Sequence, residues 1–595
     1  MAQVKVYPAG RTAILSAATI LVLSIYFYPF FHTRSTVGAT VLPPEFAPDL
    51  TLYLNLSNAT AIGENQVLNP YYQIPVPNNG AGYLKFSLDT QVFHKIESWS
   101  GGRTWLALFI WNLFWWGLLC LAALWLFEKF LPLASLGVVL TGLGLLMFFN
   151  FGVLKTLLAA WAHLPSLAGF QSLDLPYMRA FIPQVAVVFL LGYLGLQMEV
   201  LRRSRPLLWA AMGALQFFAL TVFPYTTLMM AGLTAVSVLW QLLFSKQQAA
   251  WLAVLVYGAG CAIVDAVFLK HGSLGFYASS ASRFRFQPGL LIHLMGGNWL
   301  LLAVITVAVA LIKNLAAEVK WPLVGLGTAN LALMLGDAVV PASVLLLSHH
   351  AAHFLHTTVA VLLTFVSSAA LLGRWEKSIS LRIALGLCLG FLVAGGVLLA
   401  SGSYEASLPV NGEQVRLARS LDSWKPGEQD LLIARSRDVD DACGWAVLLT
   451  KARVLFCTDA EILLTPQQNR DIHRARQALY LYLSGEDSGS LRQGLAGADP
   501  GQLMYRLGYW AEAVSLSTEE RREGIRAIQT ELIPQLERVE RHDASAGDFF
   551  RQFRRIIVLD DERNPTFPAA RVTSFLQVED EKHVDGLVVL SCVPK

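Results

Sequence analysis

The sequence predicts a polytopic α-helical membrane protein with a C-terminal α/β domain outside the cytoplasm. About eleven apolar stretches of roughly 20 residues each are long enough to cross the ~30 Å hydrocarbon layer of a bilayer. The chain of 595 residues is 55% hydrophobic and only 15% charged, which exceeds what the core of a soluble protein of this size needs. Residues 401–595 return to an ordinary soluble composition. Most of the apolar sequence is therefore expected to face lipid.

Four regions follow from this hydropathy pattern. Residues 1–31 form an N-terminal transmembrane anchor, because no small-residue cleavage site follows the first span. Residues 32–103 form a first extracytoplasmic loop, 104–400 a transmembrane helical domain, and 401–595 the C-terminal extracytoplasmic domain. The predicted spans are residues 12–31, 104–127, 132–150, 181–200, 206–223, 224–244, 249–268, 288–312, 321–346, 354–373 and 382–400.

Lysine and arginine set the predicted orientation, since short cytoplasmic loops are enriched in both. With the N-terminus inside, every predicted cytoplasmic loop contains at least one of these cations. An odd number of spans then places the C-terminal domain on the outer face. The cations of the predicted cytoplasmic segments are Lys5, Arg11, Lys129, Arg202, Arg203, Arg205, Lys246, Lys313, Lys320, Arg374, Lys377 and Arg382.

Charge and cysteine content exclude several classes of protein. The formal net charge of +3 is spread over the loops, so nucleic-acid binding is not predicted. Cys443 and Cys457 flank two strand-like runs of the outer domain, and they either form a disulfide or remain two buried thiols. The chain has no Cys/His spacing typical of zinc and none of the usual nucleotide-binding or hydrolase motifs.

The first outer loop contains an amphipathic segment followed by an aromatic turn. In P-D-L-T-L-Y-L-N-L-S, the leucines and Tyr53 form an apolar face with Asp49 near its start, as expected of a helix lying on the membrane surface. The aromatic turn is N-P-Y-Y-Q-I-P-V-P-N-N-G, residues 69–80, whose rings suit either stacking on a sugar or an interfacial belt. Asp49 is correspondingly either a catalytic carboxylate or an acid favoured at a helix N-terminus.

These motifs resemble the first outer loop of the GT-C superfamily, the polytopic glycosyltransferases that take sugars from polyprenyl-phosphate donors. The local likeness consists of the acid and tyrosine of P-D-L-T-L-Y, then G-E-N at 63–65 and N-P-Y-Y at 69–72. The order of one span, a long outer loop, many further spans and an outer C-terminal domain is also similar. The resemblance implies a helical membrane domain of GT-C type and a polyprenyl-phosphate-linked sugar donor.

The same resemblance assigns roles to residues of this loop. It implies that Asp49 is the catalytic acidic residue and that Tyr53 and Tyr71 line the substrate site. The second acidic residue is either Glu45 or Glu64, or the site has none. It further implies a bacterial cytoplasmic (inner) membrane with the C-terminal domain in the periplasm. Metal dependence differs among members of the superfamily, so a divalent metal stays open.

A histidine-rich segment offers groups for the donor phosphate, because a departing phosphate needs cations or hydrogen-bond donors. In S-H-H-A-A-H-F-L-H, the i, i+4, i+7 spacing of His349, His353 and His356 predicts one shared helical face, with His350 beside them. Three interpretations remain open: these imidazoles bind a lipid phosphate, ligate a metal or a haem, or form a plain interfacial cluster.

Arginines in two other outer loops extend the predicted substrate site. A-S-R-F-R-F-Q-P places Arg283 and Arg285 between phenylalanines, which suits either a lipid headgroup or the anchoring of a span by snorkelling side chains. L-D-L-P-Y-M-R-A-F, just before the fourth span, offers Asp174, Tyr177 and Arg179 as part of a cleft wall.

The C-terminal domain is predicted to be mixed α/β, since strand-like runs alternate with helical patterns. Asp560 to Glu562 follow a strand-like run and either bind a cation or begin a solvated turn. The strand-like runs are 431–434, 446–449, 454–457, 556–559 and 587–590, and the helical patterns are 467–483, 502–514 and 518–540.

The sequence thus favours a glycosyltransferase that moves a sugar from a polyprenyl-phosphate donor to an acceptor on the outer face of the membrane. Its expected partners are that donor and the membrane lipids. Two other classes stay open: a non-catalytic or redox subunit of a larger complex, which would use the histidines for haem or metal, and a transporter. Inverted repeats would indicate the transporter, and haem absorbance the redox subunit.

Overall fold

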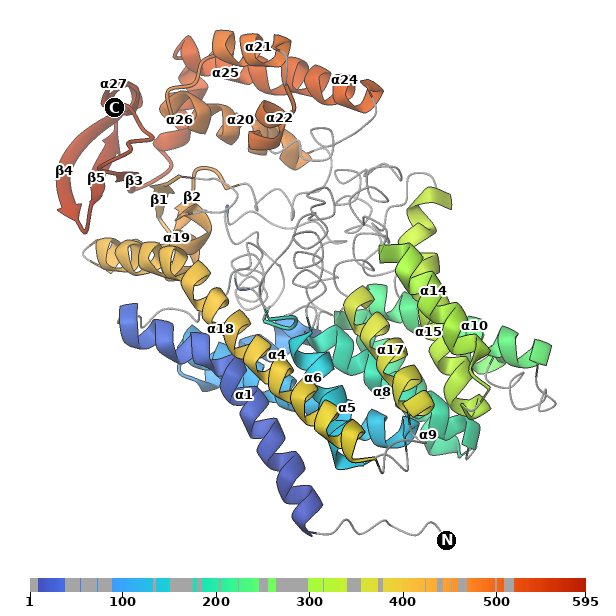
Figure 1. Cartoon of the computed structure of the whole chain (residues 1–595). Helices are drawn as coiled ribbons and strands as arrows, with labels where there is room; N and C mark the ends of the chain where they lie inside the picture. The colour runs from blue at the N-terminus through green and yellow to red at the C-terminus, as the bar shows by residue number, and fades with distance from the viewer. Residues whose placement is uncertain are drawn as a thin grey trace.

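A computed structural model gives the architecture of the chain. It is mostly helical, with a small sheet domain at its C-terminal end (Figure 1). The structure describes residues 9–37, 54, 72, 88–131, 135–149, 175–178, 184–202, 205–222, 224–244, 255–263, 298–313, 315–339, 355–372, 378–422, 424–435, 442–450, 452–457, 468–497, 500–507 and 518–595.

Apolar helices form a bundle beneath the C-terminal domain in Figure 1. Within the described residues, three contain stretches long and apolar enough to cross a membrane, Gly10–His32, Thr104–Phe130 and Ile379–Glu405, and six shorter helices are also apolar. The helices are α1 (Ala9–Val37), α4 (Leu88–Trp99), α5 (Thr104–Phe130), α6 (Leu136–Phe148), α8 (Gln184–Arg202), α9 (Pro206–Val222), α10 (Pro224–Phe244), α14 (Asn298–Leu311), α15 (Ala317–Val339), α17 (His356–Leu372) and α18 (Ile379–Asp422). The chain is an integral membrane protein by these helices, while the count of eleven spans stays a prediction.

Glycines allow close approach between helices of the bundle. A Cβ at Gly195 of α8 would lie 1.9 Å from the ring of Trp125 of α5. A Cβ at Gly142 of α6 would lie 2.4 Å from the ring of Phe365 of α17. Small residues at such contacts let helices pack closely where lipid gives no hydrophobic drive for association.

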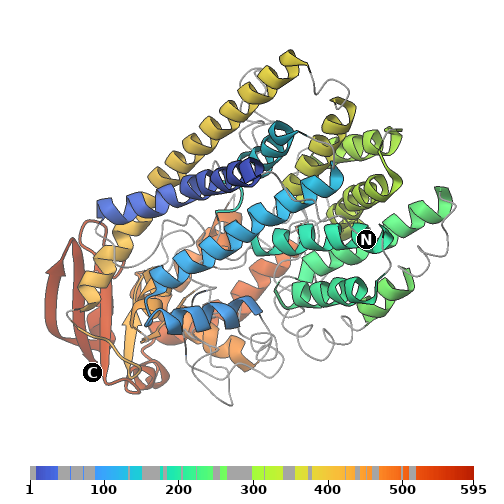
Figure 2. The same cartoon turned by 90° about the horizontal axis from the view of Figure 1, so that it is seen from below.

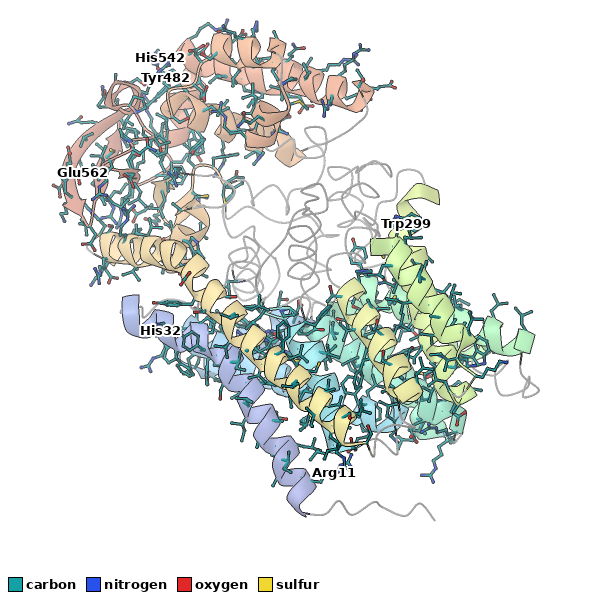
Figure 3. The ribbon with its side chains drawn as sticks, viewed as in Figure 1. Arg11, His32, Trp299, Tyr482, His542 and Glu562 are labelled. Atoms are coloured by element: carbon teal, nitrogen blue, oxygen red, sulfur yellow. The ribbon has the colours of Figure 1, made fainter. Side chains whose placement is uncertain are left out.

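Ion pairs gather at the end of the bundle away from the C-terminal domain. Figure 3 places Arg11 at this end, where its Nη2 lies 3.3 Å from Oε1 of Glu128. A second pair joins Lys129 to Glu199, which lie near the C-terminal ends of α5 and α8 respectively. This is the end that the distribution of lysine and arginine predicts to be cytoplasmic.

Helix α18 joins the bundle to the C-terminal domain. Its 44 residues would span about 66 Å at 1.5 Å per residue, about twice the thickness of the hydrocarbon layer. Seen from below, blue α1 runs beside yellow α18 along one edge of the bundle (Figure 2). The helix therefore passes through position 401, where the C-terminal domain was expected to begin.

The C-terminal domain contains a five-stranded mixed sheet with strand order β2-β1-β3-β5-β4. β1 pairs in parallel with β2 and β3, and β5 pairs antiparallel with β3 and β4. The last two strands form a hairpin whose turn has positive φ at Asp585 (51°) and Gly586 (79°). The strands are β1 (Asp430–Ile433), β2 (Arg453–Val454), β3 (Arg555–Asp561), β4 (Leu576–Val584) and β5 (Leu587–Pro594).

One predicted strand of this domain is wrong. Residues 446–449 belong to helix α19 (Ala442–Thr450). A short apolar run has the same appearance in a buried strand and in a buried helix, so its period does not distinguish them. The flanking residues Ala442, Cys443 and Gly444 are buried as well, and a buried helix accommodates all of them.

The sheet separates two hydrophobic cores. Leu432 and Ile557 lie in a core that continues into the membrane helices. Their strand neighbours Leu431 and Ile556 lie in a second core together with a layer of helices on the other face. That layer and the adjoining helices are α20 (Gln468–Leu483), α21 (Ser488–Ala496), α22 (Pro500–Arg506), α24 (Thr518–Ala527), a π-helical turn (Ile528–Leu532), α25 (Ile533–Glu540), α26 (Ala544–Phe550) and α27 (Ala569–Phe575).

The helix predicted over 518–540 is confirmed, with one irregularity. The π-helical turn Ile528–Leu532 interrupts it just before Pro534, which lacks the N–H that the α-helical ladder requires. The helix predicted over 467–483 is confirmed within one residue as α20. Tyr482 of α20 meets His542 at a centroid distance of 5.9 Å in this layer (Figure 3).

Candidate functional site

Of the predicted site residues, the structure describes His356 and, from the predicted cleft wall, Tyr177. The others lie outside the described residues, so their roles stay predictions. They are Asp49, Tyr53, Glu64, Tyr71, Arg179, Arg283, Arg285, His349, His350 and His353.

His356 is the first residue of α17, and its side chain is buried, with 2% exposure. Helix α17 begins at the end of the bundle nearer the C-terminal domain (Figure 1). A histidine in a plain interfacial cluster would instead be open to solvent or lipid headgroups. Burial of His356 therefore favours a role inside the bundle.

Tyr177, in the short segment 175–178, contacts α17 at Thr358, two residues after His356. Its hydroxyl is 2.8 Å from Oγ1 of Thr358, and both residues are buried. The indole N–H of Trp116 on α5 donates to the carbonyl oxygen of Tyr177 over 2.8 Å. The short segment 175–178, from a predicted outer loop, is thus inserted between α5 and α17.

A tyrosine phenol has an ordinary pKa of about 10, and either hydroxyl of the pair Tyr177 and Thr358 can be the donor. The phenol consequently keeps its proton at neutral pH and can donate a hydrogen bond. Tyr177 and Thr358 together offer two hydroxyl groups in an apolar setting, where such bonds are stronger than in water.

A buried amide pair lies on the same face of α5 as Trp116. Nε2 of Gln184, at the start of α8, donates to Oδ1 of Asn112 over 3.0 Å. Asn112 and Trp116 are separated by four residues, so their side chains lie above one another. Buried polar groups thus come from α5, α8, α17 and segment 175–178, and we refer to this set as the outward polar layer: Asn112, Trp116, Tyr177, Gln184, His356 and Thr358.

Two buried carboxylates occur in the described part of the first outer loop. Glu97 accepts a hydrogen bond of 2.5 Å from the hydroxyl of Thr104 and so fixes the junction of α4 and α5. Asp89, in the first turn of α4, has 3% exposure and accepts the N–H of Thr90 over 2.9 Å. Nothing in the sequence marks Asp89 as a site residue, because an acid in the first turn of a helix is common for backbone reasons alone.

Tyr72, next to the predicted substrate residue Tyr71, contacts the C-terminal domain. Its hydroxyl is 2.9 Å from Nδ1 of His473, and the guanidinium carbon of Arg476 lies 4.2 Å from its ring centroid. Both partners belong to α20. Tyr72 therefore connects the first outer loop to the C-terminal domain.

No metal-binding group of three or more His, Cys, Asp or Glu side chains occurs within the described residues. Cys443 and Cys457 are both buried and are not joined by a disulfide, so the two-thiol alternative describes them. Asp560 begins a turn rather than a cation site, because its carboxylate accepts backbone N–H groups of Asp561, Thr566 and Phe567. The run therefore begins a turn, as the second interpretation has it, although the side chain of Asp560 is buried and not solvated.

Comparison with known proteins adds one distant similarity. No protein-family model and no curated protein matches the chain. Among solved structures, the crystal structure of ArnT from Cupriavidus metallidurans bound to undecaprenyl phosphate aligns over 98% of both chains, with 12% sequence identity and a TM-score of 0.36. A TM-score of that size does not establish a common fold. What the described residues establish is an integral membrane protein whose apolar helical bundle carries a C-terminal sheet domain.

Proposed function

We propose that this protein is a glycosyltransferase that moves a sugar from a polyprenyl-phosphate donor to an acceptor on the outer face of the cytoplasmic membrane. The observation that carries the proposal is the outward polar layer, which includes the bonded pair Tyr177 and Thr358 and the buried His356 within an apolar bundle. Polar side chains inside a membrane domain are costly and commonly mark a functional site. A lipid phosphate is an anion that enters from the bilayer, so hydrogen-bond donors within the bundle suit its binding.

The chemistry assigns one task to each group. Asp49 would take the proton of the acceptor hydroxyl as its oxygen attacks the anomeric carbon. The bond from that carbon to the phosphate oxygen breaks, and its electron pair leaves with the lipid phosphate. His356 and the hydroxyls of Tyr177 and Thr358 would donate hydrogen bonds to the departing phosphate. Attack from the face opposite the phosphate inverts the anomeric configuration.

Binding of undecaprenyl phosphate to the purified protein in nanodiscs tests the lipid half of the proposal. His356→Ala is expected to weaken binding by about tenfold, the order of one hydrogen bond to a charged group. His583→Ala is the matched control, because His583 is an exposed histidine of β4 in the C-terminal sheet. Equal affinity of His356→Ala and the parent protein would remove His356 from the phosphate site.

Turnover tests the catalytic half. We expect the parent protein to consume at least one member of a panel of undecaprenyl-phosphate sugars and to release undecaprenyl phosphate. Asp49→Asn keeps the size of the side chain but removes the base, so release should fall by at least about a hundredfold while lipid binding persists. If Asp49→Asn turns over like the parent, Asp49 is not the base.

A further inference from the structure

Tyr72 is a residue of the first outer loop whose described contacts lie in the C-terminal domain. Its side chain is fully buried, with 0% exposure. Its ring and hydroxyl meet Arg476 and His473, which are three residues apart on one face of α20. A tyrosine held in this way fixes the position of the chain that carries it.

The hydroxyl of Tyr72 makes a buried hydrogen bond. Burial raises the pKa of Tyr72 well above its ordinary value, against the lowering effects of Arg476 and of the backbone N–H of Cys457. The phenol is therefore protonated at neutral pH. The phenol oxygen lies 2.9 Å from Nδ1 of His473, within hydrogen-bond distance. The phenol donates this bond when His473 carries its own proton on Nε2.

Arg476 holds the ring of Tyr72 through its guanidinium. The guanidinium carbon lies 4.2 Å from the centroid of Tyr72 and 5.0 Å from that of Phe549, and Nη1 donates to the carbonyl oxygen of Val454 over 3.0 Å. The side chain is 7% exposed, and burial lowers the pKa of Arg476 to about 10, so it stays charged at neutral pH. No carboxylate pairs with Arg476 among the described residues. The faces of two aromatic rings consequently supply its local electrostatic stabilisation.

The contact lies at the edge of the sheet where ligands of α/β domains commonly bind. Val454 is the last residue of β2, which is parallel to β1. The carboxyl ends of parallel strands, with the loops that follow them, form the usual binding crevice of such sheets. Here a side chain of the first outer loop meets the residues beside that edge.

A second fixed point lies between Asp49 and Tyr72. Leu54 is 1% exposed and belongs to the hydrophobic core that also contains the membrane helices and Tyr72. Leu54 follows Asp49 by five residues, and Tyr72 follows it by 23. The loop that carries the proposed base is thus attached at Leu54 to the core and at Tyr72 to the C-terminal domain.

We infer that Tyr72 is a positioning residue: by docking against His473 and Arg476 it lets the C-terminal domain hold the first outer loop in its catalytic conformation. This inference rests on the proposed glycosyltransferase function. In this inference, Tyr72 contacts neither the sugar donor nor the acceptor, and it acts only through the position of the loop. The C-terminal domain then contributes to turnover without supplying a reacting group.

Hydrogen exchange of the full-length protein in nanodiscs tests the docking itself. Tyr72→Ala and Arg476→Ala are expected to raise exchange in peptides around residue 72 by about tenfold, which corresponds to the loss of a buried cation–π contact and a hydrogen bond. Tyr72→Phe keeps the ring over Arg476 and should give a smaller increase. Arg474→Ala is the matched control, because Arg474 is equally buried on α20 at 6% exposure but bonds Gln477.

Turnover then separates positioning from binding. Tyr72→Ala should lower kcat by about tenfold or more while affinity for undecaprenyl phosphate stays at the parent value, since misplacing a catalytic group costs rate and not lipid contacts. Unchanged loop exchange in Tyr72→Ala and Arg476→Ala would overturn the docking. If Tyr72→Ala raises hydrogen exchange in the loop but has the same kcat as the parent protein, the positioning role would be overturned. A parent protein inactive on every donor would instead reject the proposed function and, with it, the catalytic meaning of the docking.

Discussion

Single side chains decide where this membrane domain is polar. Tyr177, Thr358 and His356 are each at least 98% buried, in a bundle made of leucine, valine and phenylalanine. Every such group must find a hydrogen-bond partner, because lipid offers none. Segment 175–178 satisfies this need by crossing to α17 with its phenol and to α5 with its backbone carbonyl. The bond between Tyr177 and Thr358 hence fixes an outer segment in the bundle.

Tyr177→Phe should destabilise the membrane domain by about 1–3 kcal/mol, since it leaves the Thr358 hydroxyl buried without this partner. The thermal unfolding midpoint in nanodiscs measures the loss. Tyr28→Phe serves as the control, because the Tyr28 side chain is 42% exposed on α1. Equal midpoints for the two variants would show that the buried bond contributes nothing.

Asp561 gives the junction of α18 and the sheet a pH dependence. Burial acts to raise its pKa, but the hydrogen bond from Arg416, together with the N–H groups of Arg563 and Asn564, outweighs burial and lowers it. A carboxylate with a lowered pKa stabilises the folded state above its unfolded pKa of ~3.9, and this contribution disappears as pH falls through the folded value. The parent protein should therefore lose thermal stability on acidification below about pH 4 more steeply than Asp561→Asn.

The comparison of the parent protein with Asp561→Asn isolates the contribution of the Asp561 carboxylate to stability. Burial raises the pKa of the neighbouring Asp560, so Asp560 acts in the opposite direction in both proteins. Parallel stability curves of the parent and Asp561→Asn between pH 3 and 6 would show that the pair with Arg416 has no thermodynamic role.

At the scale of elements, α18 is the mechanical connection of the molecule. One end packs beside α1 and α6, and the other reaches the sheet, where Arg416 and Arg419 pair with Asp561 and Asp585 over 3.0 Å each. The middle of α18 has one face packed against α6 and another face without close neighbours. Gly396 faces Phe148 of α6 at close range, whereas Gly390 meets nothing within 4 Å.

Gly142→Ala should destabilise the packing of α6 on α17, because its Cβ would meet the ring of Phe365 at 2.4 Å. Overpacking of this kind costs about 1–3 kcal/mol, which appears as a lower thermal midpoint. Gly390→Ala is the control on an open helix face, where alanine adds only helix propensity. The packing account fails if Gly142→Ala is as stable as Gly390→Ala.

At the scale of the whole molecule, charge and hydropathy separate the two ends of the bundle. The ion pairs of Arg11 and Lys129 gather at one end, and the C-terminal sheet domain lies at the other (Figure 3). Membrane insertion holds cationic loops in the cytoplasm. The sheet domain is accordingly expected on the outer face, together with the outward polar layer.

Accessibility to a membrane-impermeant maleimide tests this orientation. In a Cys388→Ser background, His583→Cys should be labelled on intact cells, whereas Lys313→Cys should be labelled only after lysis. Both positions are exposed, and the remaining thiols of the C-terminal domain are buried. Labelling of Lys313→Cys alone on intact cells would reverse the orientation and place the polar layer on the cytoplasmic side.

The sequence predicts the elements of this fold better than it predicts the candidate site. Long apolar runs indicate α1, α5 and α18 directly, since few alternatives bury 20 apolar residues in a row. In the candidate site, the sequence named Tyr177 together with Arg179, but it selected Tyr71 where the described contact belongs to Tyr72. Adjacent residues in a loop have similar composition, and only the path of the backbone decides which of them is buried.

What the sequence by itself determined is a membrane bundle, a cationic end and a mixed α/β domain, because hydropathy, charge and periodicity are local properties. Only the tertiary structure decided that α18 continues past residue 401 into the sheet domain, that residues 446–449 are helical, and that Tyr72 docks on α20. Each of these depends on a contact between segments far apart in the chain. Packing against a distant partner selects among conformations that local propensity leaves nearly equal.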